Sequence, residues 1–378
     1  MIYDLNGTEL DTAFDLNGDS LDAAYDLSGS EIWRAGIYPY IEDRICVFDE
    51  NFLNGEIITD NWNYEIGYCR NNELQHYRPE AVSIVDNNLL IHATKEHYPG
   101  DTERNSTWIS GSIQTCGKFE AFYGRWQARI KFPNVSGCWG ADWLLGGGVV
   151  FVYYDDGTHC KNYGPGMWPE DGEVDIMETI PGNTNRAHAN LWGMNGASNP
   201  HQSSFTIDLG QWHIYECEWT PTAMIMMVDG VPVYTYDLTN ANFSQYTLNG
   251  NPDSYGFYLI LNQAIGQQGG VPTESLTSMD MLVDFARVYA PANYTVDMIS
   301  PTAISLSGSD STTVGNPIVL HASFTPVNVF DRTIAWSSSD ETIAIVHGGK
   351  VTPVSAGTVT ITATTRNGLT ASKTITIT

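Results

Sequence analysis

The chain has 378 residues and a formal net charge of −27 at pH 7, while 16% of its residues are charged and 12% are aromatic. Its length suits two or three domains. The acidity would repel nucleic acid and anionic membranes, so we expect neither as a partner. We find no apolar run long enough to span a membrane. The first residues lack the basic start and apolar core of a signal peptide, so we expect none here.

Residues 1–36 contain an internal repeat. The segment Tyr3–Leu10 recurs as Phe14–Leu21 and again as Tyr25–Ile32, with a period of 11 residues. Each copy reads as a strand, an Asn-Gly or Ser-Gly turn and a second strand. Units this small bury no core of their own, so we interpret the segment as one for attachment or self-association, on a cell surface or a virion.

Residues 41–291 carry short runs of alternating apolar and polar residues, bounded by Gly, Asn, Asp and Pro. Clear examples are Arg125–Lys131, Trp212–Trp219 and Met224–Val228. Alternation with a period of two is typical of half-buried strands, and helical periodicity is rare here. The pattern predicts an all-β fold, built as a β-sandwich.

The run Gly172–Glu178 is the most informative part of this region, because it places three carboxylates in a segment that otherwise reads as a buried strand. In a regular strand Glu173 and Asp175 share a face, whereas Glu178 points to the other. All three can share a face only if the strand contains one extra residue. We therefore predict a β-bulge near Ile176–Met177.

Carboxylates gathered on one rigid surface are what glycoside hydrolysis requires. A separation of about 5–5.5 Å between two of them is expected for a retaining mechanism. Glu173 would then be the nucleophile and Glu178 the general acid/base. Asp175 would hydrogen-bond the nucleophile and help to separate the two pKa values. The alternative is an acidic edge strand or a structural cluster of carboxylates.

The run Gly172–Glu178 resembles the signature of glycoside hydrolase family 16 in its bulged form, as found in laminarinases, agarases and carrageenases. Further segments resemble the family in order along residues 41–291, and they include Asn71–Tyr77, Tyr123–Lys131, Trp139–Trp143, Trp168–Pro169, Leu259–Gly266 and Val283–Tyr289. The resemblance implies a concave β-sandwich, or jelly roll, as the catalytic domain. Asn71–Gln75 points to the laminarinase branch.

Several positions depart from the family pattern. Gly140 stands where proline is usual, Gln127 where glutamate is usual, and Leu191 where laminarinases carry a histidine. The loop Gly146–Gly166 is longer and richer in aromatic residues than the family leads us to expect. These departures surround the cleft, so they bear on the identity of the substrate more than on the type of reaction.

The candidate substrate-binding residues combine flat aromatic faces for sugar C–H surfaces with amides for hydroxyl groups. Family positions that line the cleft correspond to Trp139, Trp143 and Trp168. Conserved polar positions of the family correspond to Asn71, Asn262 and, more weakly, Gln263. Alternation places three further residues on one face of the strand after the motif: His188, Asn190 and Trp192.

The family resemblance also implies one structural calcium ion on the convex side, away from the cleft. Its matching residues are Glu50 and Asp284, with backbone carbonyls. Carboxylate and carbonyl oxygens suit Ca²⁺. No cofactor is expected for catalysis. The six cysteines show no metal-site spacing, and we expect buried free thiols rather than disulfides.

Residues 300–378 are rich in Thr, Ser, Val and Ile and poor in aromatic residues. The spacing of their turn signals predicts a small seven-stranded sandwich. Ala335–Ser338, Gly349–Thr352 and Thr360–Ala363 resemble a bacterial immunoglobulin-like domain of group 2. The resemblance implies adhesion or spacing at a cell or virion surface, and an inert spacer is the simpler alternative.

Together these features predict an endo-acting, retaining β-glucan hydrolase for β-1,3 linkages in laminarin or mixed-linkage glucan, working outside the cell or at a cell or virion surface. The acidic chain suits a neutral polysaccharide. Alternatives are a galactan hydrolase for agar or porphyran, and a carbohydrate-binding adhesin without catalysis. Transglycosylation, in which a sugar hydroxyl replaces water, is also open.

Overall fold

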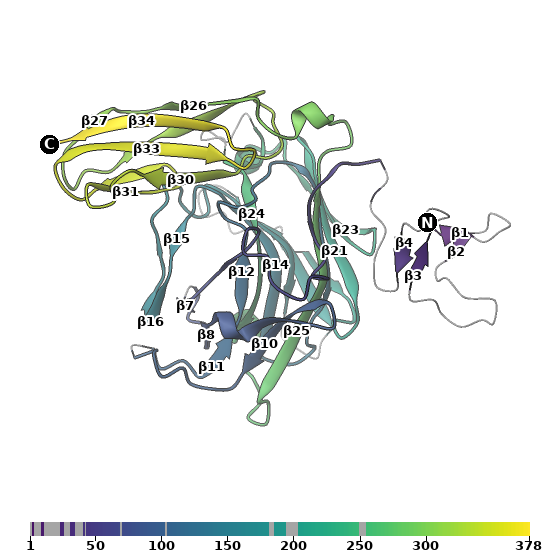
Figure 1. Ribbon diagram of the computed structural model, residues 1–378. Helices are drawn as coiled ribbons and strands as arrows, with labels where there is room; N and C mark the ends of the chain where they lie inside the picture. The colour runs from purple at the N-terminus through teal and green to yellow at the C-terminus, as the bar shows by residue number, and fades with distance from the viewer. Residues whose placement is uncertain are drawn as a thin grey trace.

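The computed structural model describes residues 41 and 43–378, except 69, 103, 181–184, 194–202 and 249–254 (Figure 1). It describes only the backbone of residues 155–158 and 203 and of four short N-terminal strands. The helices in this part of the chain are short 3₁₀ turns: η1 (Pro79–Ala81), η3 (Ala241–Tyr246), η4 (Gln267–Gly269) and η5 (Val296–Met298). No helix among the described residues has the length and apolarity needed to cross a bilayer.

The first and third copies of the N-terminal repeat each contain a pair of antiparallel strands. Strand β1 (Ile2–Tyr3) pairs antiparallel with β2 (Glu9–Leu10), and β3 (Ala23–Tyr25) pairs antiparallel with β4 (Glu31–Arg34). The predicted strand pairs are thus confirmed for these two copies, and the residues of the predicted turns lie outside the described part of the chain. The second copy lies outside the described residues, and the role in attachment stays a prediction.

The catalytic region is a sandwich of two large sheets, which confirms the predicted all-β class. The sheet that carries the motif has seven strands in a single path. In spatial order they are β20 (Ser203–Thr206), β19 (Arg186–Leu191), β18 (Glu173–Thr179), β14 (Cys138–Gly146), β24 (Phe257–Ile265), β12 (Ser112–Gln114) and β6 (Asn63–Tyr64).

The opposing sheet has twelve strands. Its main path runs through β16 (Tyr154–His159), β7 (Gly67–Tyr68), β8 (Gln75–Tyr77), β11 (Trp108–Ser110), β10 (Asn88–Thr94), β25 (Ser278–Tyr289), β13 (Gly124–Lys131), β21 (His213–Trp219), β22 (Ala223–Val228) and β23 (Val231–Asp237). Two further strands join it at β25 and β10: β5 (Cys46–Glu50) and β9 (Val82–Val85). The predicted strands Arg125–Lys131, Trp212–Trp219 and Met224–Val228 correspond to β13, β21 and β22.

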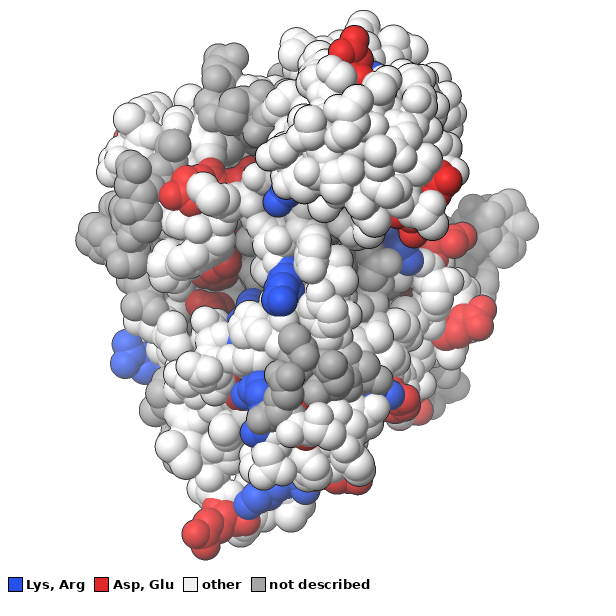
Figure 2. Space-filling model, turned by 90° about the vertical axis from the view of Figure 1, so that its left-hand side faces the viewer, with Lys and Arg blue, Asp and Glu red and all other residues white. Residues whose placement is uncertain are grey.

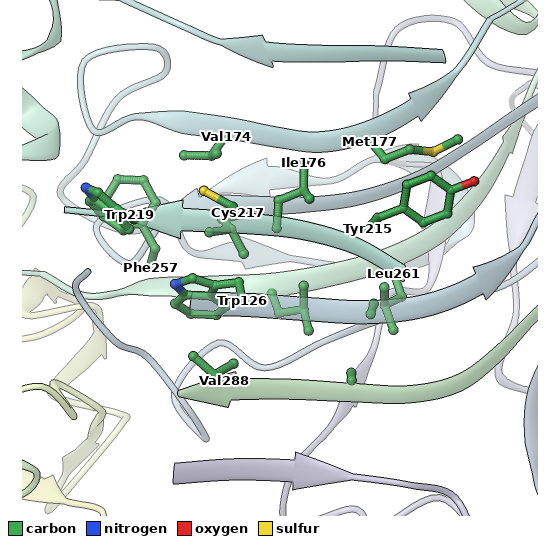
Figure 3. Packing of buried hydrophobic residues seen from close by; sticks show 14 of the residues in the cluster. Trp126, Val174, Ile176, Met177, Tyr215, Cys217, Trp219, Phe257, Leu261 and Val288 are labelled. Atoms are coloured by element: carbon green, nitrogen blue, oxygen red, sulfur yellow. The ribbon is translucent and has the colours of Figure 1, made fainter. Parts of the chain in front are cut away.

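The core lies between the two sheets. Side chains from their facing surfaces meet there, among them Trp126, Trp219 and Phe257, each at most 1% exposed (Figure 3). Burial of such large apolar surfaces is the main stabilising contribution to a sandwich of this kind. The opposite face of the seven-stranded sheet is therefore free to line a site.

The C-terminal domain is a smaller sandwich at one end of the catalytic domain (Figure 1). Its strands are β26 (Ala303–Ser307), β27 (Ser311–Thr312), β28 (Ile318–Val319), β29 (His321–Thr325), β30 (Ile334–Ser338), β31 (Ala344–His347), β32 (Lys350–Pro353), β33 (Gly357–Thr365) and β34 (Thr370–Ile377). A separate apolar cluster fills it, including Leu320, Val351 and Ile361.

Candidate active site

Strand β18 contains the predicted bulge. On the neighbouring β14, Ala141 pairs with Glu178 and Trp143 pairs with Asp175. The two β14 residues are two apart, whereas their partners on β18 are three apart, so β18 holds one extra residue between Asp175 and Glu178. The register between β18 and β19 shifts at the same place. A single inserted residue restores Glu178 to the face of Glu173 and Asp175.

The extra residue is accommodated on the core side of β18. Ile176 and Met177 are 3% and 0% exposed and both belong to the apolar core, although they are adjacent in sequence. Figure 3 shows them on the side of β18 that faces Tyr215 and Cys217 of the other sheet. Two consecutive apolar residues thus anchor the bulge, and the carboxylates are left on the opposite face.

The carboxylates line a cleft of about 490 Å³. Figure 2 shows a hollow in the surface with acidic residues set back inside it. Aromatic and polar residues share its lining, as a sugar site requires. The lining includes Arg70, Asn71, Asn72, Glu73, Trp139, Trp143, Phe151, Trp168, Glu173, Asp175, Glu178, Trp192, Asn262, Gln267 and Gln268.

Each of the three carboxylates accepts a hydrogen bond from a different indole N–H. These bonds are Trp168 Nε1 to Glu173 Oε2 (2.9 Å), Trp192 Nε1 to Asp175 Oδ2 (3.1 Å) and Trp139 Nε1 to Glu178 Oε1 (2.8 Å). Glu178 Oε2 accepts a further bond, 3.0 Å long, from Asn190 Nδ2. The tryptophans therefore orient the carboxylates, and all three indoles line the cleft.

Burial raises the pKa of all three carboxyl groups, and repulsion from neighbouring carboxylates raises that of Glu173 and Asp175 further. Burial, followed by the charge of Glu178, raises the pKa of Glu173 to about 8, while the Trp168 bond and the Arg70 cation oppose this. The same causes raise the pKa of Asp175 well above its usual value, and burial raises the pKa of Glu178. Near neutral pH the trio therefore carries fewer than three negative charges, so a proton is available to a leaving group.

The predicted residues on β14 and β24 also meet in the cleft. Trp143 Nε1 donates to Asn262 Oδ1 (2.7 Å), and Asn262 Nδ2 donates to the Tyr77 hydroxyl (2.9 Å). Asn71 lines the same cleft from a loop and has a positive φ of 56°. Trp143, Asn262 and Asn71 thus lie in the cleft, as expected from the sequence. Their binding of substrate stays a prediction.

Two predicted residues lie beside the carboxylate trio rather than on the cleft wall. His188 pairs with Glu178 across β18 and β19, and Asn190 pairs with Asp175. They are 8% and 7% exposed, and neither belongs to the lining. Burial, with the charge of Arg186, lowers the pKa of His188 to about 4, so it is neutral at pH 7. Asn190 is suited to positioning Glu178.

The prediction for Gln263 is corrected by its position. Gln263 pairs with Gly140, and Asn262 pairs with Ala141, so the two β24 residues point to opposite faces. Gln263 is fully buried, and its Nε2 donates to the Met279 carbonyl (3.2 Å). It packs between the sheets and does not contribute to the cleft.

The surroundings of Glu50 and Asp284 do not fit a calcium site. Glu50 already accepts bonds from Trp62 Nε1 (3.2 Å) and Asn61 Nδ2 (3.3 Å), and Asp284 is ion-paired with Arg129 at 2.8 Å. A guanidinium beside one proposed ligand repels a cation. Among the described residues no three His, Cys, Asp or Glu side chains are grouped to hold a metal.

Four of the described cysteines follow the expectation of free thiols. They are Cys46, Cys116, Cys138 and Cys217. Burial raises the pKa of Cys138 to about 11, so this thiol is unreactive at neutral pH. Cys69 lies outside the described residues.

Two cleft residues, Arg70 and Glu73, were given no role by the sequence. Arg70 forms a bidentate ion pair with the buried Glu65, and its guanidinium lies 5.0 Å from the ring centre of Trp143. Despite burial, that cation and hydrogen bonds from Ser112 and others lower the pKa of Glu65. Burial raises the pKa of Glu73 to about 7. Glu73 lies within the Asn-Asn-Glu-Leu-Gln run, so the family resemblance of that run could have indicated it as a cleft residue. No sequence pattern indicated Arg70.

Comparison with known proteins agrees with this architecture. Residues 71–255 match the model of glycosyl hydrolases family 16, and residues 300–375 match the bacterial Ig-like domain (group 2). The glucan endo-1,3-beta-glucosidase A1 of Niallia circulans is 30% identical over 66% of this chain and 38% of its own length. The beta-glucanase of Rhodothermus marinus is 28% identical over 64% of this chain and 83% of its own length.

A solved structure supports the same assignment. The laminarinase catalytic domain of Thermotoga maritima MSB8 aligns with a TM-score of 0.55 and 27% identity, over 66% of this chain and 99% of that domain. The catalytic domain of this chain is therefore laminarinase-like and belongs to glycoside hydrolase family 16, and the C-terminal domain is a bacterial Ig-like domain of group 2.

Proposed function

We propose that this protein is an endo-acting β-glucan hydrolase that cleaves β-1,3 linkages with retention of configuration. The observation that carries the proposal is the trio of carboxylates on one face of β18, each bound to its own indole donor in a cleft of about 490 Å³. The glucanase relatives support β-glucan as the substrate class.

In the proposed mechanism the Glu173 carboxylate attacks the anomeric carbon. Glu178 transfers its proton to the glycosidic oxygen as the bond to the leaving sugar breaks, and a covalent glycosyl ester of Glu173 forms. Water then attacks the anomeric carbon, Glu178 accepts the proton of that water, and Glu173 is released. Asp175 lies between the two groups and adjusts their charge through its own protonation.

The cleft provides an aromatic wall for the sugar at this point. Trp168 is 49% exposed, and its ring centre lies 5.0 Å from that of Trp192. Exposed indole faces suit the C–H surfaces of a pyranose ring. Because both indoles also hold carboxylates, a sugar stacked there would be aligned with the reacting groups.

Two opposing influences bear on the division of roles between Glu173 and Glu178. Glu178 accepts two N–H bonds, which favour its charged form, whereas Glu173 accepts one and is also near the Arg70 cation. Burial and the charge of Glu178 outweigh Arg70 and raise the pKa of Glu173. We therefore assign the nucleophile to Glu173 on the family resemblance, which places it first in the motif.

Hydrolysis of a panel of polysaccharides tests the proposal. We expect the release of reducing ends from laminarin and mixed-linkage glucan, with oligosaccharide products and the β-anomer formed first, as seen by NMR. Activity on agar or porphyran, without activity on either glucan, would show that the substrate is a galactan and not a β-glucan. Binding of laminarin without cleavage would identify an adhesin. We further propose an extracellular or surface location, where such polysaccharides occur, with the N-terminal repeats for attachment.

A further inference from the structure

The chain between β14 and β18 forms a partition between two hollows. Val149 and Phe151 line the catalytic cleft. Gly147 and Val150, from the same segment, line a second hollow of about 300 Å³ between the catalytic and Ig-like domains. Residues of one short segment therefore line both the substrate cleft and the hollow beside the C-terminal domain. A displacement of this segment would change both sides at once.

A tight turn of the Ig-like domain presses on this partition. Gly348, with a φ of +56°, lies between β31 and β32, and a Cβ there would be 3.0 Å from Cγ2 of Val150 and 3.1 Å from Cδ of Pro165. The Tyr255 hydroxyl donates to the Gly348 carbonyl (3.2 Å). Beside it, the His347 ring centre lies 5.8 Å from that of Tyr163. The turn thus contacts the partition on its side away from the cleft.

A second set of contacts fixes the Ig-like domain to the catalytic sandwich. Phe330 is fully buried and belongs to the catalytic core. The Arg332 amide donates to the Glu120 carbonyl (2.8 Å), and the Glu120 amide donates to the Thr333 hydroxyl (2.8 Å). Glu120 also lies behind the partition, since a Cβ on Gly147 would be 2.5 Å from Glu120 Oε2. The two domains are joined through a shared core rather than by a linker.

We propose that the Ig-like domain is a structural part of the substrate cleft, because its 347–349 turn holds the wall formed by Val149 and Phe151. It thereby determines how tightly the polysaccharide binds at that end of the cleft. This reading replaces the spacer role, since a spacer needs neither a residue in the neighbouring core nor a turn against the cleft loop. The effect on substrate binding rests on the proposed function, whereas the effect on the wall does not.

The test is a full-length double variant, His347→Ala with Tyr255→Phe, which removes the ring contact and the hydrogen bond at the turn. The matched control is Val354→Ala, at a position of the same domain that is 47% exposed. We expect amide hydrogen exchange in residues 147–166 to be faster by about fivefold, the factor that corresponds to one neutral hydrogen bond. We expect KM for laminarin to rise by a similar factor of about five, with kcat little changed.

The control should match the wild type in both measurements. Unchanged exchange in residues 147–166, or an unchanged KM, in a folded double variant would overturn the proposal. The single variant Tyr255→Phe, which removes one hydroxyl group, keeps the test available if the double variant does not fold. If the wild type cleaves no glucan, the proposed function fails, yet the exchange measurement still decides whether the turn holds the wall.

Discussion

The three indole donors allow the roles of the carboxylates to be tested by single tryptophan-to-phenylalanine changes. Each change keeps an aromatic ring and removes one N–H bond to a carboxylate. A hydrogen bond to a charged group contributes about 1.5–3 kcal/mol, and Trp168 is half-exposed, so we take about 1.5 kcal/mol for Trp168→Phe. That energy corresponds to about a tenfold change in kcat/KM at a pH where the rate follows the ionised fraction of Glu173.

The direction of the change depends on the role of the carboxylate. Loss of a donor destabilises the charged form and so raises the pKa. The nucleophile must be ionised, so Trp168→Phe should move the acidic limb of the pH profile of kcat/KM to higher pH and narrow the active range. The general acid must be protonated, so Trp139→Phe should move the basic limb to higher pH and extend the range.

The measurement is kcat/KM for laminarin from pH 3 to 10 for both variants. Trp143→Phe is the matched control, because its indole N–H is bonded to the amide of Asn262 and to no carboxylate. Its two limbs should remain in place even if KM changes. Opposite results, with Trp168→Phe moving the basic limb and Trp139→Phe the acidic limb, would exchange the assigned roles. Limbs that stay fixed in both variants would refute the argument that indole donors control the charge.

Three further outcomes are expected. Glu178→Gln should lower kcat by about 10²–10⁴-fold, the range for loss of general acid catalysis, and Glu173→Gln should lower kcat at least as much. Neither change should lower Tm. Near-normal turnover in either variant would exclude the mechanism. Burial raises the pKa of Asp142 to about 8, so the folded state keeps a proton that the unfolded state loses above about pH 4, and the free energy of unfolding falls as the pH rises from about 4 to 8. Asp142→Asn should therefore raise Tm more at pH 8 than at pH 5 in thermal melts. An equal gain at both pH values would contradict this. Chelation by EDTA should leave Tm unchanged, because Glu50 and Asp284 are already partnered, whereas a fall reversed by Ca²⁺ would show a metal site.

The fold and the bulge were predictable because both follow from strand alternation. Three carboxylates at 173, 175 and 178 cannot share a face of a regular strand, and the apolar pair Ile176 and Met177 had to be accommodated elsewhere. The structure resolves the conflict with one inserted residue on the core side. Strand alternation would also have excluded Gln263 from the cleft, because Gln263 directly follows Asn262 in a regular strand and must face the other side of the sheet.

Other features of the site depended on contacts that a single sequence does not encode. The pairing of each carboxylate with an indole is set by side-chain direction across strands and loops, as for Trp168, which lies in the turn before β18. The ion pair between Glu65 and Arg70, and the contact of Gly348 with the cleft loop, join segments without a shared sequence pattern. Alternation assigns a face of a strand, but it does not assign the neighbour of a loop residue.

The charge of the cleft argues for a neutral polysaccharide. Among the described residues of the lining, Arg70 is the one Lys or Arg, and it is already paired with the buried Glu65. Glu73 and the carboxylate trio bring four carboxyl groups to the same wall. A sulfate or uronate group would have to displace the Glu65 ion pair or remain unpaired near negative charge, and both alternatives are unfavourable. Neutral glucan hydroxyls, by contrast, can donate hydrogen bonds to the charged members of this wall.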